Sequence, residues 1–163
     1  EIKNLQMFYL KYRPKTISEI DNLQAKDMIG KILESKSLPH AFLFVGQKGT
    51  GKTSTARILA KAVNCLNNKF SSSLASFEPC NDCVNCKSIG LSSFTDVIEM
   101  DAASNRGIEE IKSLIRETSF LPMSGGYRVF IIDEAHMITN EGFNALLKTL
   151  EEPPKSAIFS FNV

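Results

Sequence analysis

The sequence predicts an α/β fold in which a parallel sheet carries helices on both faces. Apolar runs of strand length alternate with segments of helical periodicity, the first run leads into a glycine-rich loop, and a later run ends in two acidic residues. This alternation is typical of parallel sheets, because a connection between parallel strands needs a long crossover, usually a helix. The length of 163 residues suits one domain with a sizeable core.

The first half of the chain is expected to contain two helices and one strand. Residues 27–35 carry apolar side chains at helical spacing, which predicts a short amphipathic helix. Residues 41–45 form a continuous apolar run that Gly46 ends, as expected of a parallel strand buried on both faces. Residues 53–64 are rich in Ala, Leu, Lys and Arg and predict a helix. The Ser- and Asn-rich stretch 67–77 predicts an irregular loop.

The second half continues the alternation. Short apolar runs predict strands at 96–100, 128–132 and 156–161. Two helices between them are each marked by an apolar face, formed by Ile108, Ile111, Leu114 and Ile115 in one and by Phe143, Leu146, Leu147 and Leu150 in the other. Pro153 and Pro154 stop the second helix.

Composition narrows the class of protein. A net charge of +1 gives no strong attraction to nucleic acid or membranes. No apolar run approaches the roughly 20 residues that cross a bilayer, and no apolar segment follows the N-terminus as in a signal peptide. A cytoplasmic protein is therefore expected. In that compartment the four cysteines indicate metal ligands rather than disulfides.

A phosphate-binding loop follows the first predicted strand and opens a helix. The motif G-x-x-x-x-G-K-[ST] is matched in full by Gly46-Gln47-Lys48-Gly49-Thr50-Gly51-Lys52-Thr53. Its glycines let backbone N–H groups approach phosphate oxygens, and the helix N-terminus adds partial positive charge. We expect Lys52 to reach the β- and γ-phosphates of ATP and the Thr53 hydroxyl to ligate Mg²⁺. The alternative is a glycine-rich turn that binds nothing.

Two carboxylates end the predicted strand at 128–132. A buried strand delivers its last side chains to the carboxyl edge of the sheet, where open α/β sheets bind ligands. We expect Asp133 to hold Mg²⁺ and Glu134 to activate the attacking water as a general base. The alternative is a pair of ordinary solvated acids. The run Asp133-Glu134-Ala135-His136 also matches a helicase box, but a helicase needs a second motor domain.

The four cysteines form a candidate metal site. Three of them have the spacing C-x₂-C-x₂-C, and the fourth lies at the end of the helix 53–64; the four are Cys65, Cys80, Cys83 and Cys86. Four thiolates close a tetrahedral Zn²⁺ site with no open position, which favours a structural role in fixing the loop at residues 65–90. An iron–sulfur cluster and free thiols are the alternatives.

These features together resemble the gamma/tau family of bacterial DNA polymerase III subunits, the AAA+ ATPases of the sliding-clamp loader. The segments that carry the resemblance are Lys11-Tyr12-Arg13-Pro14, the phosphate loop with Ser54, the cysteines, residues 101–107 (DAASNRG) and residues 129–154 with FNALLKTLEEPP. The resemblance covers about residues 9 to 158. It implies an AAA+ nucleotide-binding core over 1–163, with the zinc-binding insertion inside it.

The resemblance also implies a role and partners. Tyr12, Arg13 and Pro14 would lie beside the adenine, where a plain entry turn is the alternative. The chain would join delta, delta-prime and further gamma/tau copies in a five-membered ring. That ring opens the sliding clamp with ATP bound and releases it on primed DNA after hydrolysis. DNA would be reached only through the assembled complex, and the sheet order would be 5-1-4-3-2.

The sequence departs from the family pattern in its last residues. In the family the strand after Pro154 ends in a sensor Thr or Asn; Asn162 lies near that position but is not assigned to it. The Ser-Arg-Cys motif, the fifth strand, the lid and the collar are missing, and the loop between Cys65 and Cys80 is longer than usual. A truncated core is expected, with the strand 41–45 as an exposed edge. The alternative function is a non-hydrolysing scaffold that binds nucleotide and zinc.

Overall fold

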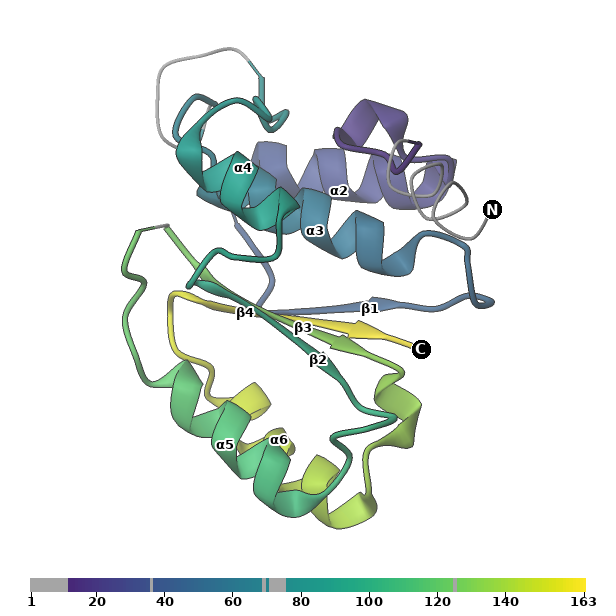
Figure 1. The fold of residues 1–163 in the computed structure, drawn as a ribbon, viewed down its shortest axis with the longest axis vertical. Helices are drawn as coiled ribbons and strands as arrows, with labels where there is room; N and C mark the ends of the chain where they lie inside the picture. The colour runs from purple at the N-terminus through teal and green to yellow at the C-terminus, as the bar shows by residue number, and fades with distance from the viewer. Residues whose placement is uncertain (1–11, 36, 69, 71–75, 125) are drawn as a thin grey trace, which may run out of the picture.

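The fold has three layers with a parallel sheet in the middle. The computed structural model describes residues 12–35, 37–68, 70, 76–124 and 126–163. Helices α2, α3 and α4 cover one face of the sheet, and α5 and α6 cover the other (Figure 1). The predicted fold class is confirmed. Lys11 and much of the loop between Cys65 and Cys80 lie outside the described residues.

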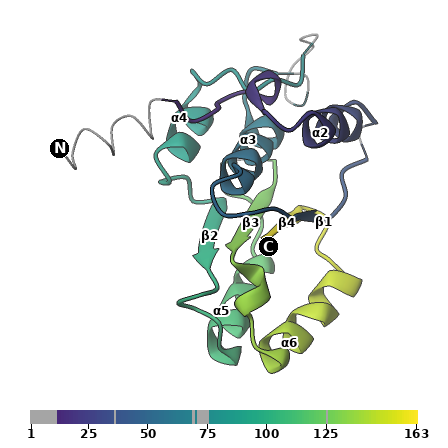
Figure 2. The ribbon, with the colours of Figure 1, turned by 90° about the vertical axis from the view of Figure 1, so that its right-hand side faces the viewer.

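The described residues form a sheet of four parallel strands in the order β1-β4-β3-β2. Its strands are β1 (Ala41–Phe44), β2 (Val97–Asp101), β3 (Arg128–Asp133) and β4 (Ala157–Asn162). This order is the 1-4-3-2 part of the predicted arrangement. In the register of β2 with β3, Asp101 pairs with Asp133, so both strands end level at the carboxyl edge. Figure 2 shows the four strands side by side between the two helical layers.

The predicted helices are present, and the short helices η1, α4 and η2 are additional. Their bounds are η1 (Ile17–Glu19), α2 (Leu23–Ser35), α3 (Lys52–Asn64), α4 (Val84–Gly90), α5 (Ile108–Thr118), η2 (Ala135–Met137) and α6 (Asn140–Glu151). Helix α2 begins four residues before the predicted start, because Asn22 Oδ1 accepts the N–H of Ala25. The short helix α4 was not predicted; it begins after Cys83, whose sulfur accepts the N–H of Cys86. No helix in the described part of the chain has the length and apolar character to cross a membrane.

Two apolar cores form because β3 is buried on both faces. Val129 and Ile131 face α2 and α3, whereas Phe130 and Ile132 face α5 and α6. The second core includes stacked rings, since Phe130 and Phe159 lie 5.2 Å apart between ring centroids. Packing in the two cores holds the carboxyl ends of the strands next to the start of α3. The side chains at these strand ends and at the start of α3 therefore lie close together.

Strand β1 corrects one expectation about burial. The sequence predicted burial on both faces over 41–45, but Leu43 is 65% exposed and Val45, which follows the strand, is 73% exposed. Phe42 and Phe44 pack towards α2 and α3, while the opposite face of β1 lies beyond the cover of α5 and α6. Among the described residues, β1 pairs only with β4. It is therefore an edge strand, as the predicted order requires when no fifth strand pairs with it.

Candidate nucleotide-binding and metal sites

A cavity of about 1160 Å³ opens at the carboxyl edge of the sheet. Its walls bring together four parts of the sequence: residues 12–22, the phosphate loop with the start of α3, the ends of β2 and β3, and the end of β4. The cavity is large enough for a nucleotide and is open to solvent. Every predicted nucleotide-site residue except Gln47 lines it.

The phosphate loop has the backbone conformation that its glycines allow. Gly49 and Gly51 both have φ of 87°, in the left-handed region, and Gly51 is the N-cap of α3. A Cβ on Gly46 would lie 2.9 Å from the Thr50 hydroxyl, so this turn also leaves no room for a side chain. The loop therefore wraps around the start of α3, with the first N–H groups of the helix at the cavity.

The Lys52 side chain folds back onto the phosphate loop. Its ammonium group donates to the backbone carbonyls of Gly46 and Gln47, the latter at 2.9 Å. The charge thus lies over the loop rather than along the outer surface. These partners are exposed carbonyls, and the ammonium lies beside the cavity that Lys52 lines.

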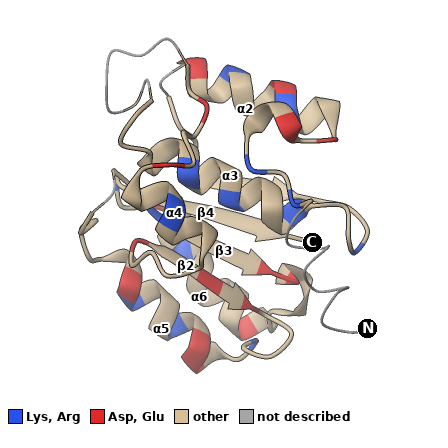
Figure 3. Ribbon diagram, turned by 45° about the horizontal axis from the view of Figure 1, so that its top comes forward, with Lys and Arg blue, Asp and Glu red and all other residues tan. Residues whose placement is uncertain are grey.

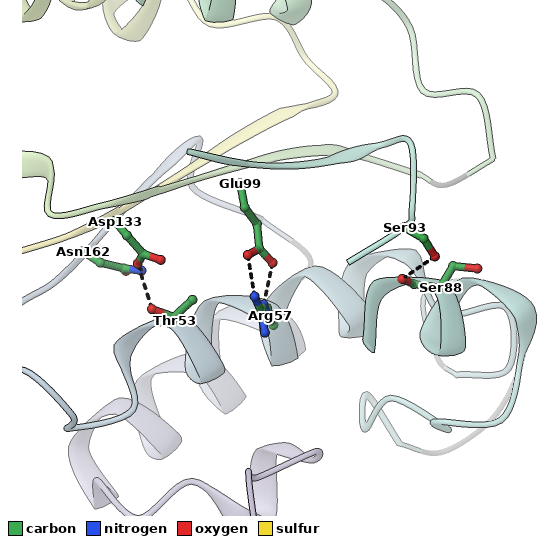
Figure 4. Close-up of polar contacts among 7 residues, drawn as sticks. All are labelled: Thr53, Arg57, Ser88, Ser93, Glu99, Asp133 and Asn162. Carbon is green, nitrogen blue, oxygen red and sulfur yellow. Dashed lines mark hydrogen bonds and ion pairs between the residues drawn. The ribbon is translucent and has the colours of Figure 1, made fainter. Parts of the chain in front are cut away.

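Asp133 is the polar centre of the site. Its Oδ1 accepts hydrogen bonds from the Thr53 hydroxyl at 2.8 Å and from the Asn162 amide at 2.5 Å (Figure 4). The three side chains come from the ends of β3 and β4 and the start of α3. A hydroxyl and a carboxylate in direct contact fit the ligand pair that Mg²⁺ takes in phosphate-loop proteins. The predicted roles of Thr53 and Asp133 are compatible with this geometry.

Glu134 follows Asp133 in an unusual backbone conformation. Its φ of 53° and ψ of 41° lie in the left-handed region, which costs a non-glycine residue on the order of 1 kcal/mol or more. The turn carries the carboxylate away from the strand axis and into the cavity wall. There, Oε2 lies 3.4 Å from Nε2 of His136, and both side chains are about half exposed. A carboxylate in this position is accessible to a water molecule in the cavity.

Tyr12, Arg13 and Pro14 line the same cavity. Tyr12 is 71% exposed, whereas Arg13 and Pro14 are half-buried. Residues 20–22 continue this wall. The N-terminal segment and the phosphate loop therefore share one cavity.

The four cysteines are brought together as predicted. Their sulfur atoms all lie within 4.8 Å of one another, and none forms a disulfide. A tetrahedral site with Zn–S bonds of about 2.3 Å has sulfurs about 3.8 Å apart, so a small adjustment accommodates the ion. Backbone N–H groups donate to the sulfurs, including Cys83 to Cys80 at 3.2 Å and Cys80 to Cys65 at 3.4 Å. Such donors fit thiolate ligands.

The protonation of these thiols differs across the cluster. Burial raises the pKa of Cys65 and of Cys86, and at Cys86 the neighbouring sulfurs add to the rise. Burial acts in the same direction at Cys80, but the N–H groups of Cys83 and Asp82 outweigh it and lower the pKa to about 6. A bound divalent cation favours the thiolate form of all four. Metal binding is therefore expected to release protons.

Charge is distributed unevenly around the sheet. Figure 3 shows acidic positions on β2 and at the end of β3, across from basic positions on α3. One ion pair links the basic and acidic positions: the guanidinium of Arg57 on α3 forms a bidentate contact with the carboxylate of Glu99 on β2 (Figure 4). The pair joins the helix of the phosphate loop to the strand that ends at Asp101.

Comparison with known proteins identifies the family. The family model described as DNA polymerase III, delta subunit, matches residues 22–162. The chain belongs to this family. The tau subunit of DNA polymerase III from Bacillus subtilis is 46% identical over 158 residues, which cover 94% of this chain and 26% of that protein. The chain thus spans about a quarter of the length of this relative, and the predicted resemblance to gamma/tau subunits is confirmed.

Solved structures show the same fold for this DNA polymerase III family chain. A gamma-subunit-related protein of Thermotoga maritima has a TM-score of 0.57 and 22% identity, covering 84% of this chain and 38% of its own. The RuvB Holliday junction branch migration motor of Thermotoga maritima has a TM-score of 0.56 and 19% identity, covering 93% and 41%. At these identities the likeness concerns the fold alone. It supports the AAA+ P-loop class predicted from the sequence.

Several residues of this polymerase III family chain line the cavity although the sequence did not predict them as site residues. Asn162 was noted near a sensor position but not assigned, and it bonds Asp133 directly. Asp101, His136 and Met137 line the cavity as well. Only the alternation of β4 and the level ends of the strands bring Asn162 to Asp133. The predicted strand ended at residue 161, whereas β4 spans Ala157–Asn162. A prediction that extended the strand by one residue would have placed Asn162 at the carboxyl edge.

Proposed function

We propose that the chain binds ATP with Mg²⁺ and hydrolyses it as part of a DNA polymerase III clamp loader. The observation that carries the proposal is the 2.8 Å contact of Thr53 with Asp133 at the mouth of an intact phosphate loop. A loop that had lost its function would have no reason to keep this hydroxyl–carboxylate pair, the lysine and the glycines together. Membership of the polymerase III family supports the cellular role.

Each group has a distinct part in the proposed reaction. Backbone N–H groups of the phosphate loop and Lys52 bind the phosphate chain. Thr53 and Asp133 would hold Mg²⁺, which supplies neutralisation of the phosphate charge when bound. Glu134 orients a water molecule and accepts its proton. Asn162 holds Asp133 in place from the adjacent strand. Tyr12, Arg13 and Pro14 contact the base.

We propose Zn²⁺ for the cysteine cluster and a structural role for it. The four cysteines can supply all four ligands of a tetrahedral site, whereas a catalytic zinc site would keep one open position. The surrounding module, residues 65–90, has one short helix and few buried apolar side chains among its described residues. A bound ion would supply the stability that such a segment lacks.

The partners and location are proposals from family membership. The chain would assemble in the cytoplasm with delta, delta-prime and further gamma/tau copies, and would act on a sliding clamp. Primed DNA would be contacted by the whole assembly, since the chain itself carries a net charge of only +1.

Single-turnover hydrolysis tests the enzymatic proposal. The full-length protein, alone and assembled with its partner subunits, clamp and primed DNA, is mixed with radiolabelled ATP. Hydrolysis that rises on assembly and is lost in Glu134→Gln supports the ATPase. Tight ATP binding with no hydrolysis in any assembly would instead establish the non-hydrolysing scaffold.

A further inference from the structure

The cysteine module and the nucleotide cavity share a structural element. We call residues 12–22 the wall segment, because its two ends, 12–14 and 20–22, line the cavity. The middle of the wall segment, which includes η1, does not line the cavity and faces the cysteine module. Figure 2 shows this purple segment passing over α4 and α3 before it enters α2. Whatever holds its middle therefore positions both of its lining ends.

Glu78 is the first anchor of the wall segment. Its two carboxylate oxygens accept the backbone N–H groups of Ile17 at 2.7 Å and Ser18 at 2.9 Å. These are the first two amides of η1, which have no partner within so short a helix. Both bonds are charge-assisted. Glu78 lies only two residues before Cys80. The position of Cys80 in the cysteine cluster therefore restricts where the Glu78 carboxylate can lie in space.

Asn81 is the second anchor, and it also reaches the helix of the phosphate loop. Its Nδ2 donates to the carbonyl of Lys15 at 2.9 Å, and its Oδ1 accepts from Nζ of Lys61 at 2.9 Å. Lys61 belongs to α3 and is 8% exposed, so this contact is shielded from water. Asn81 lies between Cys80 and Cys83 with φ of 57°, a conformation that asparagine tolerates better than most residues.

We propose that Glu78 and Asn81 are positioning residues of the nucleotide pocket, through which metal occupancy of the cysteine cluster sets the affinity for the nucleoside part of the ligand. The inference rests on the proposed function, in that the cavity must bind ATP. Metal ligation folds the turn that carries both anchors, and the anchors hold the wall segment at the cavity. Loss of the metal, or of the anchors alone, releases the wall.

The phosphate loop provides an internal reference. It is held by β1, β4 and α3, and its first amide donates to the carbonyl of Val163 at 3.1 Å. The Gly46–Val163 contact lies outside the wall segment, whose η1 packs on α3. We therefore expect a ligand that has phosphates but no base to be less sensitive to the anchors than ATP. If the wall is in place for a fifth of the time in an anchor variant, the Kd for ATP rises about fivefold.

Three variants of the full-length protein separate these effects. Glu78→Ala removes both bonds to η1. Asn81→Asp removes the bond to Lys15 but keeps an acceptor for Lys61 and leaves all cysteines intact. Asp82→Asn is the matched control, because it neutralises an acid of the same module that pairs only with the exposed Lys87 in the described contacts. Calorimetric titrations with Mg·ATP and with Mg·tripolyphosphate compare ligands with and without a nucleoside.

The expected result is a Kd for ATP raised about fivefold in Glu78→Ala and in Asn81→Asp, with the Kd for tripolyphosphate changed less than about twofold. Bound zinc stays at the parental level, and amide hydrogen exchange accelerates at Ile17 and Ser18. Asp82→Asn matches the parent. Removing the metal from the parent by chelation raises the Kd for ATP to a similar extent, and adds little in Glu78→Ala.

Contrary outcomes are distinguishable. Parental ATP affinity in both anchor variants, or an equal loss for tripolyphosphate, overturns the inference while the proposed nucleotide site stands. A parent protein that binds neither ligand, or a Lys52→Ala variant that binds both as the parent does, overturns the proposed function and this inference with it.

Discussion

The Thr53 hydroxyl donates a 2.8 Å hydrogen bond to Oδ1 of Asp133, although the two residues lie 80 positions apart in the sequence. One belongs to the first turn of α3 and the other is the last residue of β3. Packing of α3 on the sheet closes this distance, and the parallel strands bring Asn162 to the same oxygen. The contact turns two separate motifs into one site, and most of the following predictions concern it.

Lys52→Ala is expected to weaken ATP binding by at least about tenfold, because a charged hydrogen bond contributes about 1.5–3 kcal/mol. Folding should persist, since the carbonyls of Gly46 and Gln47 that lose a donor are exposed to water. Titration with a fluorescent ATP analogue measures the affinity, and thermal unfolding checks the fold. Lys31→Ala on the exposed surface of α2 removes the same charge as a control. Equal affinity in Lys52→Ala and Lys31→Ala would refute the role of Lys52.

Glu134→Gln is expected to retain ATP and to slow hydrolysis in the assembled loader by about 10²–10⁴-fold, since it removes the base but keeps the shape. The matched control is Glu141→Gln, an equivalent change at an exposed position in the first turn of α6. Single-turnover hydrolysis rates of the two variants and of the parent protein are compared. Unchanged turnover in Glu134→Gln would assign the base to another residue.

Asp133→Ala is expected to weaken Mg²⁺-dependent ATP binding, while binding measured in a chelator changes little. The substitution also leaves the hydroxyl of Thr53 and the amide of Asn162 without their acceptor, at a cost of about 1–3 kcal/mol in the free energy of unfolding. Asp133→Asn keeps an acceptor oxygen and separates the two effects. It should recover stability without recovering Mg²⁺ dependence. Full Mg²⁺ dependence in Asp133→Asn would contradict the assignment.

Protein purified without added zinc is expected to contain one zinc ion per chain. Cys83→Ser should lower that content and the melting temperature, and a loss of a few kcal/mol in a chain of this size corresponds to about 10 °C. Ser93→Ala, outside the cluster, is the control. Elemental analysis gives the stoichiometry. Bound iron with a visible absorption band would establish the cluster alternative.

Strand β1 predicts self-association of the 163-residue chain. Its outer edge has no strand partner among the described residues, and Leu43 is 65% exposed on it. Leu43→Lys should shift the chain towards monomer, because a charged side chain disfavours pairing at an edge. The control is Leu91→Lys, which changes an exposed leucine at the end of α4. Sedimentation velocity that shows the parent to be monomeric would remove the basis for this prediction.

The sequence alone determined the features that depend on consecutive residues or fixed spacing. The phosphate loop could be predicted from the sequence because all of its groups lie within eight consecutive positions. The placement of Asp133 and Glu134 at a strand end followed from the apolar run before them. The spacing of the three later cysteines predicted a candidate metal-binding turn in the same way. Strand order came from family resemblance. None of these inferences required knowledge of distances across the fold.

Tertiary structure decided the contacts between segments that share no local pattern. Whether Asn162 reaches Asp133 depends on the register of β4 against β3. A slip of one residue would turn the Asn162 side chain to the other face of the sheet. The bonds from Glu78 to η1 depend on how a loop folds after α3, and no periodicity encodes that path. Exposure of Leu43 depends on whether helices cover its face of β1, so its apolar sequence predicted burial wrongly. Side-chain chemistry is local, but the partner of each side chain is set by packing.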